Sequence, residues 1–230
     1  MRLLGVLGGM SWTSTGLYYR GLNAGVADRL GGLHSARLLL HSVDFAPVAQ
    51  AQHDGDWDLT AQVLGAAAGT LELGGAEAIL LATNTMHRVA GEIEDAAGLP
   101  LLHIADPTAA ALLADGRRRV GLLATRFTME ERFYVGRLHE QGLDVVVPGE
   151  RDRATVHGII YDELVRDVVR PESRDAYLAV VDRLVAAGVE AVVLGCTEIT
   201  LLLQDGDADV PLYDTTALHV AAGVDWLCAD

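Results

Sequence analysis

The sequence predicts an α/β fold built from two similar halves, each a mostly parallel sheet flanked by helices on both faces. Short apolar runs alternate with longer amphipathic segments along the chain, which is the pattern of strand–helix–strand units. The apolar runs are nearly continuous, as in Ala78-Ile79-Leu80-Leu81, and strands without a polar side are typical of a sheet covered on both faces. The third observation is that the first half of the chain resembles the second.

The predicted elements follow in order. Strands are expected at residues 3–8, 36–42, 78–82, 101–104, 119–124, 144–147 and 191–195. Helical patterns lie between them, for example at residues 60–73, 85–96, 129–141, 174–187 and 215–227. This alternation favours parallel strands, because a parallel pair needs a crossover connection that a helix supplies.

The internal repeat is clearest at two strand ends. Residues 74–85 read GGAEAILLATNT and residues 187–198 read AGVEAVVLGCTE. The distance along the chain from Gly5 to Thr83 nearly equals that from Gly121 to Cys196. A duplicated α/β unit explains both facts, although any two strand–turn–helix units share some likeness. Polar stretches at residues 115–119 and 205–209 are the expected boundaries between the halves.

Composition excludes several classes of function. The formal net charge of the 230-residue chain is -15, so nucleic acid is not expected as a partner. All 17 basic residues are Arg. Without Lys the chain can form neither the Schiff base that holds pyridoxal phosphate nor a GxxxxGK[ST] phosphate loop. An anionic substrate would need a local positive field from Arg or from helix N-termini.

Targeting and metal signals are weak. The opening residues fit a first strand better than a signal peptide, and no apolar run has the length of a membrane span. With two Cys in 230 residues, a reducing cytoplasm is the expected location. The eight His show no metal-ligand spacing, so no metal is expected. The turn Gly8-Gly9 does not fit GxGxxG and is expected to be a tight strand–helix turn or a close approach to a ligand.

Polar side chains follow two of the predicted strands, at residues 82–87 and 195–199. Ligands gather beyond the carboxyl ends of parallel strands. Free N–H groups of a first helical turn bind carboxylates there, and we expect the helix dipole to favour the thiolate of Cys196. The side chains of Asn84, Thr85 and Thr197 can also donate hydrogen bonds to such a carboxylate.

Structural alternatives stand beside these functional ones. Free Cys is often a small buried hydrophobe, which is the interpretation we prefer for Cys228 and an alternative for Cys196. The threonines are also suited to helix capping. His87 either faces the cleft or is a hydrogen-bonded helix residue, and we prefer the second interpretation. The same applies to His103, which lies at another strand end.

The motifs together resemble the aspartate/glutamate racemase superfamily over nearly the whole chain. The resemblance rests on GGMSW at residues 8–12, TNT at residues 83–85 and GCTEI at residues 195–199. It implies two pseudo-symmetric Rossmann-like lobes, residues 1–115 with 208–230 and residues 116–207, with the active site in the cleft between them. In that family a Cys from each lobe faces the α-carbon, one removing the proton and the other returning one, without a cofactor.

The chain departs from this pattern at the first Cys. Cys196 matches the second catalytic Cys, whereas Thr83 stands at the position of the first, as in a branch that the runs LATNTMH and LGGLHSA also resemble. A hydroxyl is a far weaker acid or base than a thiol, so we expect slow turnover that needs a helping group or water.

The resemblance also implies the binding residues. Asn84, Thr85 and Thr197 are expected to hold the α-carboxylate and Glu198 the ammonium group. Met10, Ser11 and Gln52 are expected to line the pocket near the side-chain carboxylate. Arg126 either pairs with that carboxylate or lies on the surface near Glu130.

The predicted function is racemisation of aspartate, glutamate or both. The expected partner is therefore a small acidic amino acid, and the resemblance suggests that the enzyme is a homodimer. Two alternatives remain at this point. A single thiol would suit a decarboxylase of malonate-type acids, and a chain with one catalytic Cys absent would suit a non-catalytic protein that binds acidic amino acids.

Overall fold

The computed structural model describes residues 1–229, which form two compact units. Unit 1 contains Met1–His103 together with the chain from His219 onward, and unit 2 contains Ile104–Leu218. Each unit has its own four-stranded sheet, in which every strand pair is parallel. None of the helices in the described residues is long and apolar enough to cross a membrane.

Unit 1 is a sheet covered by helices on both faces. Its strands have the order β2-β1-β3-β4 and are β1 (Leu4–Gly8), β2 (Leu38–Ser42), β3 (Ala78–Leu81) and β4 (Leu101–Leu102). Its helices are α1 (Trp12–Leu30), α2 (Phe45–Asp54), α3 (Trp57–Leu73), the 3₁₀ turn η1 (Thr85–Val89), α4 (Ala90–Ala97) and most of α10 (Thr215–Cys228).

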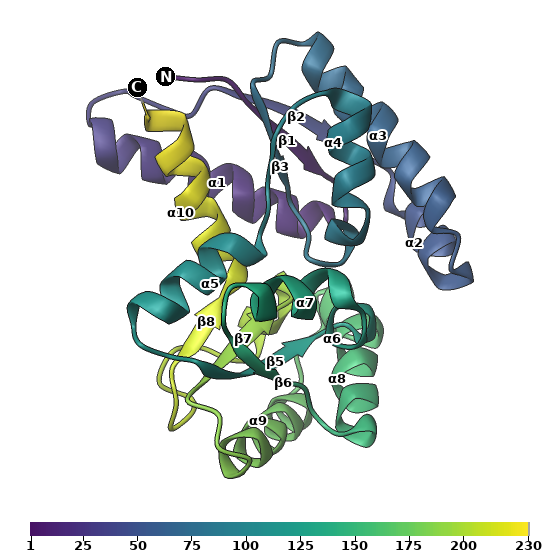
Figure 1. Ribbon diagram of the computed structural model, residues 1–230, viewed down its shortest axis with the longest axis vertical. Helices are drawn as coiled ribbons and strands as arrows, with labels where there is room; N and C mark the ends of the chain where they lie inside the picture. Colours follow the sequence, from purple (N-terminus) through teal and green to yellow (C-terminus); the bar gives the residue numbers. More distant parts are fainter. Residues whose placement is uncertain (230) are drawn as a thin grey trace. The chain divides into compact units, whose positions relative to one another are not determined.

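Helices lie on both faces of this sheet (Figure 1). An apolar layer holds them to each face. On one face, Leu22 of α1 and Leu227 of α10 pack against Leu4 and Leu80. On the other face lie α2, α3 and α4, with a core whose members include Val48, Leu64, Ile79, Leu81 and Ile93. Both faces of β1 and β3 are therefore buried, which explains the continuous apolar runs of these strands.

Unit 2 repeats the topology of unit 1. Its strands have the order β6-β5-β7-β8 and are β5 (Arg119–Ala124), β6 (Asp144–Val146), β7 (Ala191–Gly195) and β8 (Leu212–Asp214). Its helices are α5 (Ala105–Ala114), α6 (Arg126–Glu130), α7 (Arg132–Glu140), α8 (Glu150–Asp162), η2 (Leu164–Arg166), α9 (Pro171–Ala186) and η3 (Thr197–Leu201). Since β5 replaces β1 and β7 replaces β3, the equal strand orders agree with the repeat in the sequence.

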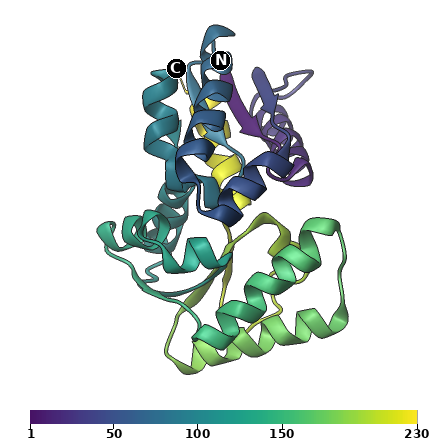
Figure 2. The same cartoon turned by 90° about the vertical axis from the view of Figure 1, so that its right-hand side faces the viewer.

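One core holds unit 2 together. Tyr134 of α7 and Tyr177 of α9 are fully buried in it, together with Val156 of α8 and Val193 of β7. Ala105, Ala109 and Leu112 of α5 belong to the same core, so α5 packs with the second sheet. Figure 2 shows α8 and α9 side by side.

The predicted fold class is confirmed, and every predicted strand is present. The strand β8 was not predicted, because only three residues pair with β7 and Pro211 precedes them. Two predicted helices are interrupted. Residues 85–96 form the 3₁₀ turn η1 followed by α4, and residues 129–141 divide into α6 and α7 at Glu131, whose backbone is extended.

The glycine turn after β1 is a tight strand–helix connection. A Cβ at Gly8 would lie 2.5 Å from the side chain of Thr15. Gly9 has a φ of 99°, and a Cβ there would lie 2.3 Å from the carbonyl oxygen of Val43. The N–H of Gly9 donates to Oγ1 of Thr15 at 2.8 Å. Glycine is required at both positions because the chain has no room for a side chain there.

Candidate functional site

The candidate residues of unit 1 gather at the carboxyl ends of two neighbouring strands. β1 and β3 pair through Leu7 and Leu81, and the N–H of Ala82 donates to the carbonyl of Leu7 at 2.9 Å. The segments that follow these strands therefore start side by side. They carry Met10, Ser11, Thr83, Asn84 and Thr85, all of them buried, and Gln52 of α2 is buried as well. We call these six residues candidate set 1.

Ser11 begins α1 as its N-cap. Its Oγ accepts from the N–H of Ser14 at 3.3 Å. The carbonyl of Ser11 in turn accepts from Oγ1 of Thr15 at 2.9 Å. The hydroxyl of Thr15 thus ties Gly9 to Ser11 and fixes the backbone that carries Met10 and Ser11.

The turn after β3 is closed by a side chain. The N–H of Thr83 donates to the carbonyl of Leu81 at 2.9 Å, and the N–H of His87 donates to the carbonyl of Asn84 at 3.1 Å. Nδ1 of His87 lies 2.8 Å from the carbonyl oxygen of Thr83. His87 is fully buried and hydrogen-bonded, as its structural interpretation predicts.

The candidate residues of unit 2 follow β7. Cys196, Thr197 and Glu198 are buried, with 9%, 6% and 8% of each residue exposed. Sγ of Cys196 donates to Oε2 of Glu198 at 3.0 Å. We call Cys196, Thr197 and Glu198, together with Arg126 after the neighbouring strand β5, candidate set 2.

The environment of Cys196 corrects one expectation. Burial, the negative charge of Glu198 and the hydrogen bond to Glu198 raise the pKa of the Cys196 thiol well above its ordinary value. The backbone N–H groups of Glu198 and Thr197 lower this pKa, as expected at the start of a helical turn, but their effect is smaller. The following element is only the five-residue turn η3, so its dipole is small. Cys196 therefore rests as a thiol.

A second strand end supports this turn and was missed in the sequence. β8 pairs with β7 through Asp214 and Leu194. Oγ1 of Thr215 donates to the carbonyl of Leu194 at 2.9 Å, and the carboxylate of Asp214 accepts from the N–H of Thr216 at 2.8 Å. The signal was present, because Asp214-Thr215-Thr216 is a polar run after an apolar one.

Arg126 is the exposed member of candidate set 2. Its backbone N–H donates to Nδ1 of His157 at 3.2 Å, and its guanidinium carbon lies 5.7 Å from the ring centre of Phe127. Glu130 instead pairs with Arg153 at 2.8 Å. Within residues 1–229 the guanidinium of Arg126 has no carboxylate partner, so its charge is available to a ligand.

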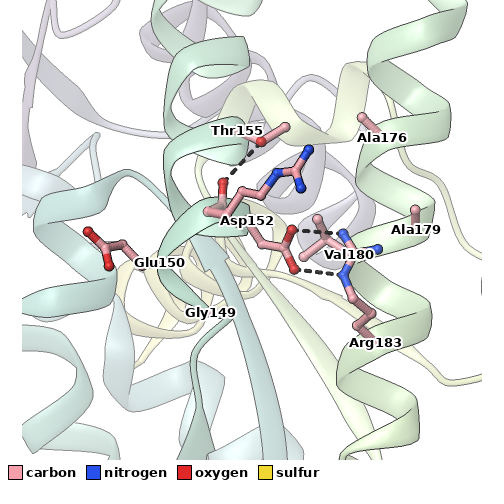
Figure 3. Close-up of a pocket in the computed structure, with 9 residues that line it drawn as sticks. Gly149, Glu150, Asp152, Thr155, Ala176, Ala179, Val180 and Arg183 are labelled. Carbon is pink, nitrogen blue, oxygen red and sulfur yellow. Dashed lines mark hydrogen bonds and ion pairs between the residues drawn. The ribbon is translucent and has the colours of Figure 1, made fainter.

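One hollow in unit 2 lies apart from these residues. Its volume is about 610 Å³ and it lies between α8 and α9 (Figure 3). Arg183 lines the hollow, and its Nε and Nη2 donate to the two carboxylate oxygens of Asp152 at 2.7 and 2.8 Å. No candidate residue lines this hollow, so we do not assign the chemistry to it. Among the described residues no cluster of His, Cys, Asp or Glu suits a metal ion.

Comparison with known proteins places these features in a family. Residues 7–223 match the model of the Asp/Glu/hydantoin racemase family. An Asp/Glu racemase candidate from Yersinia pestis is 51% identical, with 100% of both chains covered and a TM-score of 0.94. An aspartate racemase homologue from Pyrococcus horikoshii is 30% identical over 100% of both chains, with a TM-score of 0.84. The broad-specificity amino-acid racemase RacX of Bacillus subtilis is 23% identical, over 64% of this chain and 63% of its own.

Proposed function

Because the chain belongs to the Asp/Glu/hydantoin racemase family, we propose that it interconverts the L and D forms of aspartate, glutamate or both without a cofactor. The observation that carries this proposal is the hydrogen-bonded pair of Cys196 and Glu198 at the end of β7. The equivalent strand of unit 1, β3, ends in Thr83-Asn84-Thr85. Racemisation by two groups needs one acid/base residue for each face of the α-carbon, and we propose Cys196 and Thr83 for these two roles.

Cys196 and Glu198 act as one acid/base pair in this proposal. Cys196 rests as a thiol, because burial and Glu198 raise its pKa. In one direction the thiol donates its proton to the α-carbanion. In the other direction Glu198 first accepts the thiol proton across the 3.0 Å hydrogen bond, and the thiolate then removes the α-proton. The role of Glu198 toward the substrate ammonium is compatible with this exchange, since a carboxylate has two oxygens.

Thr83 serves the opposite face. Its hydroxyl donates a proton to the carbanion in one direction and takes the α-proton from the substrate in the other. A helping group or a water molecule returns or removes the proton, so that the hydroxyl is neutral between turnovers. Threonine is a poor acid compared with a thiol, so this half of the reaction limits the rate. Because enantiomers have equal free energy, the ratio of kcat/KM in the two directions is one.

In this proposal the side chains of Asn84, Thr85 and Thr197 donate hydrogen bonds to the α-carboxylate. All three residues are buried. Since η1 and η3 are short 3₁₀ turns, side chains contribute more to this contact than helix dipoles do. The contact strengthens in the transition state, because negative charge grows on the carboxylate as the α-proton leaves.

The side chain of the substrate meets a different group. Met10, Ser11 and Gln52 line its pocket. Arg126 supplies the positive charge that a second carboxylate requires in a chain of net charge -15. Its guanidinium has no acidic partner among residues 1–229, which supports an acidic rather than a neutral amino acid as the substrate.

Chiral chromatography of the reaction products tests this function. L-Aspartate, D-aspartate, L-glutamate, D-glutamate and L-alanine are incubated separately with the wild type, and we expect each acidic enantiomer to give its mirror image while alanine does not react. Cys196→Ala abolishes the reaction, and Cys228→Ala, the matched control, does not. Binding of aspartate and glutamate without conversion would refute racemisation, and carbon dioxide release from a substituted malonate would show the decarboxylase chemistry instead.

The hydroxyl of Thr83 is tested by two variants of similar size. Thr83→Val replaces the hydroxyl with a methyl group and is expected to lower kcat by at least about a hundredfold, the usual contribution of an acid/base group. Thr83→Ser keeps the hydroxyl and is expected to retain activity. Equal activity of the two variants would exclude Thr83 as an acid/base group.

A further inference from the structure

Three imidazole rings lie together in the interior of unit 1, and the proposed reaction uses none of them. The rings are those of His87, His103 and His219. The ring centres of His87 and His103 are 4.5 Å apart, and those of His87 and His219 are 5.8 Å apart. Nδ1 of His219 lies 3.0 Å from the hydroxyl of Tyr18.

Hydrogen-bond chemistry fixes where two of these rings carry their protons. Nδ1 of His87 lies 2.8 Å from the carbonyl oxygen of Thr83, and Nε2 of His219 lies 2.7 Å from that of Leu102. A carbonyl oxygen only accepts, so both of these nitrogens carry a hydrogen. In its neutral form His219 then has a lone pair on Nδ1, to which Tyr18 donates.

The bond from His87 replaces one that the backbone does not make. In an α-helix the carbonyl of residue 83 would accept from the N–H of residue 87. Here that N–H donates to Asn84 instead, because η1 is a 3₁₀ turn. Thr83 is buried, and its carbonyl accepts a hydrogen bond from the imidazole of His87 in place of the His87 backbone N–H. The orientation of the peptide between Thr83 and Asn84 therefore depends on a side chain.

We propose that His87 is a positioning residue for the reaction, which holds the Thr83 hydroxyl and the Asn84 side chain in place through its Nδ1–H bond to the Thr83 carbonyl. This inference rests on the proposed function of Thr83. The ring touches the turn from inside unit 1, so its effect is on geometry and not on proton transfer. A misplacement of about 1 Å in a reacting group costs about a hundredfold in rate, so such a bond has a measurable effect.

Burial agrees with a fixed neutral ring. Desolvation, with smaller contributions from His103 and His219, lowers the pKa of His87 well below its ordinary value. His87 consequently stays neutral at pH 7, with Nδ1 as the protonated nitrogen. The buried cluster thus keeps the His87 ring neutral, and the contact with the Thr83 carbonyl selects the tautomer with its hydrogen on Nδ1.

Two amide variants separate positioning from packing. His87→Asn places an N–H donor near the position of Nδ1, whereas His87→Gln places it near the position of Nε2. Each variant is assayed in deuterated water for α-proton exchange of the L and the D substrate. We expect His87→Gln to lose at least about tenfold in exchange on the face served by Thr83 and to keep the Cys196 face unchanged. His87→Asn should stay within about threefold of the wild type on both faces.

Nitrogen NMR of the wild type provides a test that needs no variant. With ¹⁵N-labelled histidine we expect the His87 ring to be neutral at pH 7, with its hydrogen on Nδ1. A hydrogen on Nε2 would overturn the proposal, and so would equal exchange rates for the Asn and Gln variants or a folded His87→Asn variant that has lost exchange on the Thr83 face. If the wild type exchanged no α-proton of any amino acid tested, the proposed function would fail, while the tautomer measurement would still report on the turn.

Discussion

Replacing Gly8 by Ala tests how the strand–helix turn supports candidate set 1. The added Cβ would lie 2.5 Å from both Cγ2 and Oγ1 of Thr15 and 3.1 Å from its Cβ. These atoms are buried, and the side chain of Thr15 must move. Its hydroxyl would then lose the bonds to Gly9 and Ser11, whose lengths are 2.8 and 2.9 Å.

The cost follows from these contacts. Two hydrogen bonds are worth about 1 kcal/mol each, and overpacking of a core position costs about 1–3 kcal/mol, so Gly8→Ala should lose about 3–5 kcal/mol of unfolding free energy. Because a typical domain is stable by about 5–15 kcal/mol, this variant should be partly unfolded at warm temperatures. Its kcat should also fall, since Ser11 is no longer held.

Urea unfolding measures the loss, and two further variants control for its cause. Gly16 lies on α1, and a Cβ added there would have no neighbouring atom within 4 Å, so Gly16→Ala should be neutral or add about 1 kcal/mol of stability. Thr15→Ala removes both of the 2.5 Å contacts. Gly8→Ala combined with Thr15→Ala should therefore cost much less than the sum of the two single changes. A Gly8→Ala variant as stable as the wild type, or strictly additive losses, would refute this reasoning.

Three other predictions concern charge. Because burial lowers the pKa of His87, the unfolded chain binds a proton below about pH 6.5 that the folded chain does not bind, and the unfolding free energy should fall by up to about 1.4 kcal/mol for each pH unit of acidification. Urea unfolding at several pH values should give a smaller dependence on pH for His87→Asn, and equal slopes for the two proteins would contradict the assignment. Glu198→Gln in a Cys228→Ala background should lower the pKa of the Cys196 thiol, since a negative charge is removed, and alkylation of the thiol at alkaline pH should become faster. An unchanged dependence of the alkylation rate on pH would show that burial alone sets this pKa. Arg126→Gln should raise KM for aspartate and glutamate by about ten- to a hundredfold and spare kcat, and an unchanged KM would remove Arg126 from the pocket.

The fold was predictable because its strands are buried on both faces. Runs such as residues 78–82 and 191–195 have no polar side, so their position follows from hydrophobicity alone. Short elements were not predictable in this way. β8 has three residues and depends on pairing with β7, and the break at Glu131 depends on tertiary packing that periodicity does not record.

The sequence located the two polar strand ends but not their electrostatics. Cys196 was expected to be readily ionised, because a helical turn follows it. The structure adds burial and the adjacent charge of Glu198, which together outweigh the turn. The contact between His87 and Thr83 was also hidden, since a residue four positions away normally bonds through its backbone.

Hydrogen–deuterium exchange resolved by enantiomer tests the central claim most directly. In deuterated water, proton NMR follows the α-proton of pure L or D substrate with the wild type, Cys196→Ala and Thr83→Val. We predict that the wild type exchanges and inverts both enantiomers, and that neither variant inverts either one. Thr83→Val should still exchange one enantiomer without inversion, and Cys196→Ala should exchange at most the other. Exchange of the same enantiomer by both variants, or inversion by Cys196→Ala, would contradict a reaction with one acid/base residue on each face.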